Sequence, residues 1–265
     1  MEDVHGEMFS DAAAYEAMMG RWSSRLAALF LDFAELGDAD SVLDVGCGTG
    51  SLVKAILERT ERAYVVGIDP AEPFIDFART SLPVSRASFD CGSALNLPYP
   101  DASFDHSLSL LVFQFLKQPG IAASEMRRVT RRGGTVAACT WDRTGQEMSE
   151  LFWEECVRLD PAAEEKAQRP NVCNRAGQLA ELWRATGFEE VREVTLEMQT
   201  DFTCFDDFWL PYTAGVGAQG VYVASLTPEK REVLREALRR RFAGEQDRPF
   251  SLRAAALAVR GTCAR

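Results

Sequence analysis

The stretch Val42–Gly50, VLDVGCGTG, decides the fold of this chain. A short apolar run leads into three glycines with the spacing Gly46-x-Gly48-x-Gly50. The residues that follow, 51–59, place apolar side chains at helical intervals, so a strand, a glycine turn and a helix succeed one another. This order opens a βαβ unit, in which bare backbone can approach a ligand closely.

Two details separate this turn from a dinucleotide-binding loop. Only one residue lies between the last two glycines, whereas the pattern G-x-G-x-x-G requires two. Asp44 also places a negative charge beside the turn, which would repel a pyrophosphate. The turn therefore argues against a nicotinamide oxidoreductase and favours a ligand with a cationic ammonium group.

The next apolar run, Ala63–Asp69, ends in a carboxylate. An acid at the C-terminal tip of the second parallel strand can accept two hydrogen bonds from a ribose diol. Asp69 precedes Pro70, and Asp-Pro also starts helices, so the alternative role of Asp69 is that of a helix N-cap.

With both motifs in view, the chain resembles the class I S-adenosylmethionine-dependent methyltransferases, most closely the bacterial type 11 group. Asp90–Asp105, DCGSALNLPYPDASFD, is similar to that family's segment G-D-A-x-x-L-P-F-x-x-x-S-F-D. Glu125–Asp142, EMRRVTRRGGTVAACTWD, is similar to its segment E-x-x-R-V-L-x-P-G-G-x-x-x-x-x-x-W. The similarity runs from about Tyr15 to Asp142 and is weaker beyond.

Strands alternating with helices predict a parallel sheet with crossover helices. The resemblance implies an α/β, Rossmann-like, seven-stranded and mostly parallel sheet with helices on both faces and an antiparallel last strand. The predicted strands are 42–45, 64–68, 87–90, 104–111, 135–140, 191–199 and 254–261. The predicted helices are 11–34 with a break near Gly20, 51–60, 72–80, 121–130, 148–159, 175–186, 206–210 and 228–242.

We expect a single methyltransferase domain over residues 1–265. Its predicted parts are an N-terminal helical cover (1–37), a cofactor-binding core (38–142), helical lid insertions (143–175 and 201–252) and the end of the sheet (176–200 and 253–265). Trp209, Tyr212 and Tyr222 fall in the second insertion, where they either line the acceptor site or pack the lid.

Composition limits the partners and the compartment. A net charge of −11 opposes binding to a phosphate backbone, so no nucleic-acid partner is expected, and the basic cluster Arg239–Arg241 is interpreted as the solvated face of a helix. Seven scattered cysteines without a C-x-x-C pair indicate a reducing compartment and no metal site. No apolar run reaches about 18 residues and the N-terminus is acidic, so we expect a cytoplasmic protein without a membrane partner, either a monomer or a homodimer.

The resemblance implies S-adenosylmethionine as the cofactor and S-adenosylhomocysteine as its product. Backbone atoms of Gly46 and Gly48 would contact the amino acid end of the cofactor, with Asp44 as counter-charge, while Thr49 would cap the helix or contact the carboxylate. The predicted cofactor-binding residues are Tyr15, Arg21, Asp44, Gly46, Cys47, Gly48, Thr49, Gly50, Asp69, Pro70, Ser93, Ala94, Leu95, Ser109 and Leu110.

The adenine end departs from the family. Where the family has an Asp that accepts a hydrogen bond from the adenine amino group, this chain has Ser93. A hydroxyl still accepts, but an uncharged bond is weaker by about 1 kcal/mol. The Ala94 backbone N–H and the Leu95 side chain can still contact the ring. We therefore expect the site to bind a purine, but less tightly than in the family. Alternatively, Gly92 and Ser93 form only a turn.

Two further groups of residues are placed by the resemblance and by strand position. Arg21 and Tyr15 would lie near the cofactor carboxylate, or else be a surface arginine and a core tyrosine. Ser109 and Leu110 leave the fourth strand at the edge where open parallel sheets bind ligands.

Methyl transfer from a sulfonium is an in-line displacement, so the protein mainly has to align two reactants and exclude water. An acid–base residue is optional, and the candidates are His106 and Asp142. His106 lies early in the fourth strand, far from the C-terminal rim, whereas Asp142 ends the fifth strand on that rim. We therefore predict methyl transfer to a small or medium-sized molecule. The alternative is a protein of the same fold that binds the cofactor without methylating.

Overall fold

The structure is a computed structural model that describes residues 12–37, 41–82, 85–167, 172–215 and 217–264. The chain divides into two compact units. The first comprises Met1–Arg21, Thr144–Pro170 and Glu197–Ala254, and the second comprises Trp22–Arg143, Asn171–Leu196 and Ala255–Arg265. The single domain over residues 1–265 and its predicted parts stay a prediction.

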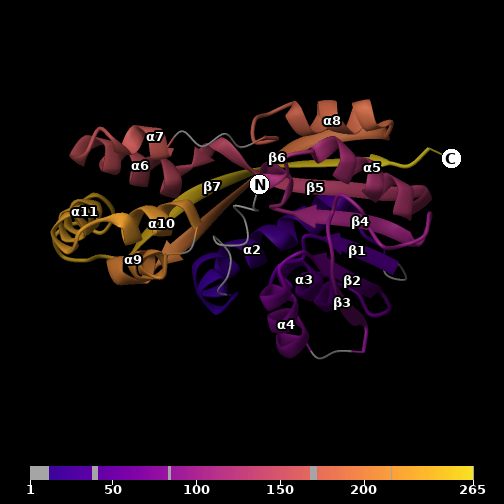
Figure 1. Cartoon of the computed structure of the whole chain (residues 1–265), viewed down its shortest axis with the longest axis horizontal. Helices are drawn as coiled ribbons and strands as arrows, with labels where there is room; N and C mark the ends of the chain where they lie inside the picture. The colour runs from indigo at the N-terminus through magenta and orange to yellow at the C-terminus, as the bar shows by residue number, and fades with distance from the viewer. Residues whose placement is uncertain (1–11, 38–40, 83–84, 168–171, 216, 265) are drawn as a thin grey trace. The chain divides into compact units, whose positions relative to one another are not determined.

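A seven-stranded sheet has the order β3-β2-β1-β4-β5-β7-β6 (Figure 1). Six strands are parallel and the last is antiparallel, which confirms the predicted Rossmann-like class. The strand order turns back between β1 and β4, and ligands bind at such a switch point in open sheets. The strands are β1 Ser41–Val45, β2 Tyr64–Asp69, β3 Ala87–Cys91, β4 Phe104–Leu110, β5 Thr130–Gln146, β6 Glu189–Phe202 and β7 Phe250–Thr262.

The helices agree with the predicted ones in most places. The structure adds α7, α10 and the 3₁₀-helix η1, which the sequence did not predict. Helix α2 runs through Gly20, so the predicted break there is wrong. A helical glycine costs about 1 kcal/mol, and burial of Trp22, Leu26 and Phe30 on one face of α2 offsets that cost. The helices are α2 Ala12–Ala34, α3 Ser51–Arg59, α4 Glu72–Ser81, the 3₁₀-helix η1 Phe113–Phe115, α5 Pro119–Val129, α6 Glu147–Leu159, α7 Ala163–Ala167, α8 Gln178–Thr186, α9 Phe205–Thr213, α10 Gly217–Ser225 and α11 Pro228–Phe242.

The core of the second unit forms where α5 and α8 pack on the sheet (Figure 1). Alternate residues of β1, Leu43 and Val45, face this core, as expected for a strand covered on that side. Trp183 of α8 is fully buried, lies 5.2 Å from the ring of Phe113 and donates its indole N–H to the Val136 carbonyl at 3.0 Å. This packing fixes the backbone just beyond β4, next to the glycine turn.

Aromatic side chains form the core of the first unit. Trp209 stacks on Phe205 at 6.0 Å, and Tyr212 lies 5.4 Å from Phe152. Trp209 and Tyr212 are only 3% exposed, so both are packing residues of their own unit. Of the two roles predicted for them, the structure shows the packing role.

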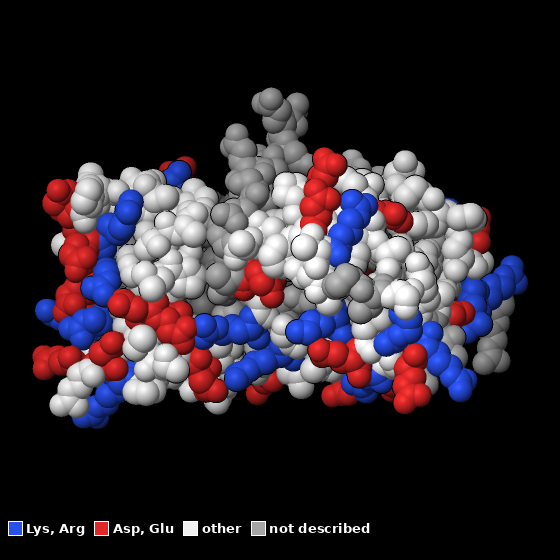
Figure 2. Space-filling view, turned by 90° about the horizontal axis from the view of Figure 1, so that it is seen from below, with Lys and Arg blue, Asp and Glu red and all other residues white. Residues whose placement is uncertain are grey.

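The basic cluster Arg239–Arg241 on α11 is paired with acids. Arg239 and Arg240 both contact Glu236, at 2.8 and 2.9 Å, and Arg241 contacts Glu154 at 2.6 Å. On the face shown in Figure 2, basic and acidic side chains of the described residues are likewise interspersed. Within the described residues, no helix has the length and apolarity needed to cross a membrane, and no group of three or more His, Cys, Asp or Glu side chains is arranged to hold a metal ion.

Candidate functional site

The glycine turn after β1 requires glycine for two separate reasons. Gly46, Gly48 and Gly50 have φ angles of +76°, +53° and +93°, a region that other residues rarely adopt. At Gly46 there is also no room for a side chain, because a Cβ would lie 2.3 Å from Cγ2 of Val112. Val112 follows β4, so the tips of β1 and β4 touch at this turn.

Asp69, at the end of β2, is bonded to the same turn. Its Oδ2 accepts a hydrogen bond from the Gly48 backbone N–H at 3.0 Å, and its Oδ1 accepts one from the Ala71 N–H at 2.9 Å. Burial raises the pKa of Asp69, and these two N–H groups lower it. Each carboxylate oxygen has a second lone pair, so Asp69 can still accept hydrogen bonds from a diol. Helix α4 has Ala71 as its N-cap residue, so the alternative of Asp69 as the N-cap is not what the structure shows.

Helix α3 begins directly after the turn. Its N-cap residue is Gly50, so Thr49 does not occupy the capping position, although it is buried beside it. The Cys47 thiol is buried as well, and burial raises its pKa, so it is no nucleophile at neutral pH. The contributions of Thr49 and Cys47 to a ligand site stay predictions.

Asp44 is the chemically most unusual residue of this region. It is 1% exposed, and neither of its carboxylate oxygens has a hydrogen-bond partner among the described residues. Burial, and to a lesser degree the charge of Asp69, raise the pKa of Asp44 to about 8. An isolated buried carboxylate is costly, and a cation placed next to it would relieve that cost. The residues around the turn therefore suit a ligand that carries an ammonium group and a diol.

The loop from β3 to β4 contains the residues predicted for the adenine end. Its start is tied to β2, because the Gly92 N–H donates to the Asp69 carbonyl at 3.0 Å. Ser93 is exposed and its hydroxyl accepts a hydrogen bond from the Leu95 N–H at 3.2 Å. The Ser93 carbonyl accepts another from the Asn96 N–H at 3.2 Å, so the turn runs from Ser93 to Asn96 and does not include Gly92. Ala94, inside this turn, is buried. The turn leaves the hydroxyl hydrogen of Ser93 available, and its contact with a purine stays a prediction.

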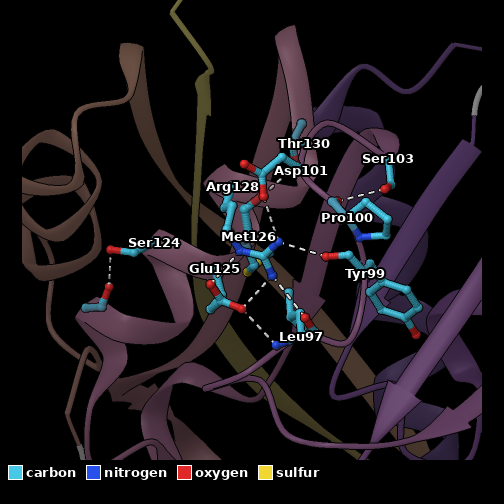
Figure 3. Close-up of polar contacts among 11 residues, drawn as sticks. Leu97, Tyr99, Pro100, Asp101, Ser103, Ser124, Glu125, Met126, Arg128 and Thr130 are labelled. Carbon is cyan, nitrogen blue, oxygen red and sulfur yellow. Dashed lines mark hydrogen bonds and ion pairs between the residues drawn. The ribbon is translucent and has the colours of Figure 1, made fainter.

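Two side chains of α5 clamp the middle of this loop (Figure 3). Arg128 donates to the carbonyls of Leu97 and Tyr99 at 2.9 and 2.7 Å and pairs with Asp101 at 2.9 Å. Glu125 accepts from the Leu97 N–H at 2.8 Å and pairs with Arg128 at 2.7 Å. This clamp was not predicted from the sequence. Its signal was the E-x-x-R spacing, which places both side chains on one side of a helix.

A second contact holds the same loop against β3. The Tyr99 hydroxyl donates to Oδ2 of Asp90 at 2.8 Å, and burial together with this bond raises the pKa of Tyr99. Beside the loop is a surface hollow of about 650 Å³, lined by Leu95 and, from α5, by Gly120, Ile121 and Ser124 among others. Neither Asp44 nor Asp69 lines it, so the hollow is separate from the carboxylates at the strand tips.

The tip of β4 completes the rim of the sheet. Ser109 is fully buried and its hydroxyl donates to the Val45 carbonyl at 2.8 Å, which joins β4 to the end of β1. Leu110 is 9% exposed, and the next residue, Leu111, has a φ of +63°, an uncommon conformation for a bulky residue. The chain thus turns sharply here, directly beside the glycine turn.

The two acid–base candidates lie at different ends of the sheet. His106 is the third residue of β4 and pairs with Val42 and Thr135, so it lies away from the C-terminal rim, as the sequence predicted. Strand β5 continues to Gln146, so the prediction that Asp142 ends this strand is wrong. Pairing with β4 stops at Cys139, however, which leaves Asp142 beyond the part of β5 that pairs with β4.

Arg21 and Tyr15 belong to the first unit, whereas the glycine turn belongs to the second. Within its own unit, the Arg21 guanidinium binds both carboxylate oxygens of Asp207, at 2.5 and 3.2 Å, and lies over the ring of Phe202. This ion pair lowers the pKa of Asp207. A role of Arg21 and Tyr15 at the cofactor stays a prediction.

The strand order and the glycine turn define a protein with a Rossmann-like fold. Residues 43–138 match the family model described as a methyltransferase domain. The chain is 33% identical over 153 residues to a malonyl-[acyl-carrier protein] O-methyltransferase of Erwinia pyrifoliae, which covers 57% of this chain and 55% of that protein. It is 28% identical over 205 residues to a demethylmenaquinone methyltransferase of Roseiflexus castenholzii. That match covers 69% of this chain and 84% of the relative. These findings confirm that the chain resembles the class I S-adenosylmethionine-dependent methyltransferases, with residues 43–138 matching their methyltransferase domain.

Solved structures agree on the fold. The structure of Haemonchus contortus phosphoethanolamine N-methyltransferase 2 in complex with S-adenosyl-L-methionine has a TM-score of 0.60 and 16% identity, and the match covers 99% of this chain and 59% of that one. The chain spans 38%, 55% and 24% of the lengths of three curated relatives that it matches. The activity of the whole protein is therefore a proposal.

Proposed function

We propose that this protein transfers a methyl group from S-adenosylmethionine to a small or medium-sized acceptor and releases S-adenosylhomocysteine. The single observation that carries the proposal is Asp44, a buried carboxylate that has no hydrogen-bond partner among the described residues and lies beside a glycine turn that Asp69 holds in place. A ligand with an ammonium group near one acid and a ribose diol near the next matches this pair of carboxylates.

Each part of the strand-tip site has a proposed task. Backbone groups of Gly46 and Gly48 bind the amino acid end of the cofactor, and Asp44 balances its ammonium group. Asp69 accepts hydrogen bonds from the ribose, next to Pro70 at the start of the turn into α4. The remaining residues proposed to contact the cofactor are Tyr15, Arg21, Cys47, Thr49, Gly50, Ser93, Ala94, Leu95, Ser109 and Leu110.

When bound, S-adenosylmethionine supplies a methyl group already activated on a sulfonium. The protein's own residues then have to hold the two reactants in line and keep water away, which can supply several orders of magnitude in rate. His106 lies away from the rim, so Asp142 is the better placed candidate for accepting a proton from an oxygen or nitrogen acceptor.

The acceptor is a small molecule in this proposal. The relatives are named for acceptors as different as malonyl-[acyl-carrier protein] and demethylmenaquinone, so family membership alone does not select one. A net charge of −11 and the pairing of Arg239–Arg241 with acids support an acceptor other than nucleic acid. Seven free cysteines, five of them buried, support a place in the reducing cytoplasm.

The test is calorimetric titration with S-adenosylhomocysteine. Wild type is expected to bind, and Asp69→Ala is expected to bind at least about tenfold more weakly, because charged hydrogen bonds contribute about 1.5–3 kcal/mol. Asp76→Ala is the matched control, since Asp76 lies on the following helix, is exposed and pairs with exposed Arg79. Absence of binding by wild type, or equal affinities of wild type and Asp69→Ala, would contradict the proposal.

A second candidate is a protein that binds this cofactor without transferring the methyl group. Ser93 favours it, because an uncharged hydroxyl engaged with Leu95 stands where the family has an acid. Cell extract incubated with the protein and a deuterated-methyl donor separates the two candidates. A compound that gains the label supports methyl transfer, whereas tight binding without labelling supports the second candidate.

A further inference from the structure

Gln114 lies near the point where the glycine turn after β1 meets the tip of β4. It is the middle residue of η1, which follows β4 at the switch point of the sheet. Val112, two residues earlier, fills the space above Gly46. Two residues of extended chain span at most about 7 Å, so the backbone of Gln114 is close to the glycine turn.

The side chain of Gln114 is held in one orientation. Its Oε1 accepts a hydrogen bond from the Trp141 backbone N–H at 2.8 Å, and the residue is only 5% exposed. Because the partner is a donor, the amide oxygen must face Trp141 and the NH₂ group must face away from it. The amide thus bridges the tips of β4 and β5, beyond the last pair of the two strands, Leu110 and Cys139.

The NH₂ group of Gln114 is the unused part of this arrangement. No described residue accepts a hydrogen bond from its Nε2, although that nitrogen is not completely enclosed by protein. Nearly buried amide donors without a partner are unfavourable. An oxygen atom of a bound molecule would satisfy them.

We infer that the Nε2 group of Gln114 donates hydrogen bonds to an oxygen of the methyl acceptor, which is therefore a molecule with a carbonyl, carboxylate or phenolic oxygen. This inference rests on the proposed function. The amide offers only donors to the site, so an acceptor molecule that presents an ammonium group or a hydrocarbon there leaves both donors unpaired. A site built to bond a polar group discriminates strongly against analogues that lack it.

The experiment uses the full chain, cell extract and S-adenosylmethionine with a deuterated methyl group, and mass spectrometry identifies the labelled compound. Gln114→Glu keeps the oxygen that Trp141 requires and replaces the donors with a negative charge. We expect it to bind S-adenosylhomocysteine within about twofold of wild type and to label the same compound at least about tenfold more slowly. Gln114→Met removes the donors without adding charge and covers the case in which a buried Glu prevents folding.

The matched control is Gln118→Glu, which makes the same change at an exposed position four residues along the chain and should label at the wild-type rate. Unchanged labelling by both Gln114 variants overturns the inference while the proposed function stands. A labelled compound without any such oxygen also overturns it. Loss of S-adenosylhomocysteine binding in both variants shows that the amide faces the cofactor, which likewise contradicts it. If wild type labels nothing in the extract, the proposed function and the inference fall together.

Discussion

Asp44 is a residue whose ionisation should couple the folded structure to its ligand. An aspartate in an unfolded chain has a pKa of about 3.9, whereas burial beside Asp69 raises the pKa of Asp44 to about 8. Between these two pH values the folded protein holds a proton that the unfolded chain has released. The free energy of unfolding therefore loses a contribution as pH rises from about 4 to about 8.

Binding of a cationic ammonium group should expel this proton. At pH 7 Asp44 is mostly protonated in the free protein, and the ligand's positive charge lowers its pKa. We expect S-adenosylhomocysteine to bind with release of about one proton at pH 7, and its affinity to increase at least about tenfold from pH 6 to pH 8. Calorimetry in buffers with different ionisation enthalpies measures the released proton. Asp44→Asn should bind more weakly and release none, and an equal proton release in wild type and variant would falsify this assignment.

The same substitution should change the stability of the free protein in a pH-dependent way. Asp44→Asn carries no ionisable group, so it lacks the loss of stability that wild type suffers above pH 4. Between pH 5 and pH 8, the difference in unfolding free energy should shift by at least about 2 kcal/mol in favour of the variant. Urea unfolding at both pH values measures the shift. Parallel pH profiles of the two proteins would show that Asp44 is already ionised in the fold.

The glycine turn shows how far sequence can predict a site. The spacing of Gly46, Gly48 and Gly50 predicted the turn, and Asp69 was predicted at the right strand tip. The contact of Gly46 with Val112 was out of reach, because it depends on how β1 and β4 are placed side by side in the sheet. Patterns along the chain identify local structure, whereas contacts between distant segments require the register.

Two alanine variants can separate the stability effect of the Gly46–Val112 contact from that of the positive φ angle. Gly46→Ala should suffer both a positive φ and a clash with Val112, at a combined cost of about 3 kcal/mol or more. Gly133→Ala is the control, since Gly133 has a φ of +74° but open space where a Cβ would lie, so it should lose only about 1 kcal/mol. Adding Val112→Ala should recover part of the loss at Gly46 and none at Gly133. Equal losses for both alanine variants in denaturant unfolding would rule out the clash.

The clamp of Glu125 and Arg128 should determine how firmly the loop after β3 is held. Arg128→Met removes the donors to the Leu97 and Tyr99 carbonyls, so backbone amides of residues 92–102 should exchange hydrogen faster. S-adenosylhomocysteine should bind several-fold more weakly, because the adenine end loses its positioning. Arg131→Met is the control, because it removes only an exposed ion pair with Asp105, in which the arginine side chain is 57% exposed. It should change neither the hydrogen exchange of the loop nor the affinity for S-adenosylhomocysteine. If the Arg128 and Arg131 variants exchange alike, the clamp has no positioning role.

In the molecule as a whole, the parallel core was easier to predict than the segments after Trp141. Strands β1 to β5 follow from apolar runs, glycines and alternating helices, but α10 has no strong pattern and was missed. Arg21 illustrates the same limit at long range. Its guanidinium binds Asp207, far along the chain, and the sequence did not predict this ion pair. The place of Arg21 near the cofactor carboxylate stays a prediction. An ion pair between such distant residues leaves no periodic signal in the sequence.

The distribution of thiols over the whole chain gives a test that needs no ligand. All seven cysteines are free, and five of them, Cys47, Cys139, Cys156, Cys173 and Cys263, are buried. Cys91 is exposed and Cys204 is partly exposed. A thiol reagent such as Ellman's reagent should therefore label Cys91 quickly and Cys204 more slowly. The five buried thiols should react only after unfolding, because burial keeps the reagent away from them. Burial also raises the pKa of each of these five thiols. Cys91→Ser should remove the fast phase, and guanidinium should expose all seven thiols without a reductant. Fewer than seven reactive thiols in guanidinium would reveal a disulfide and contradict both the structure and the reducing compartment that the cysteine pattern predicts.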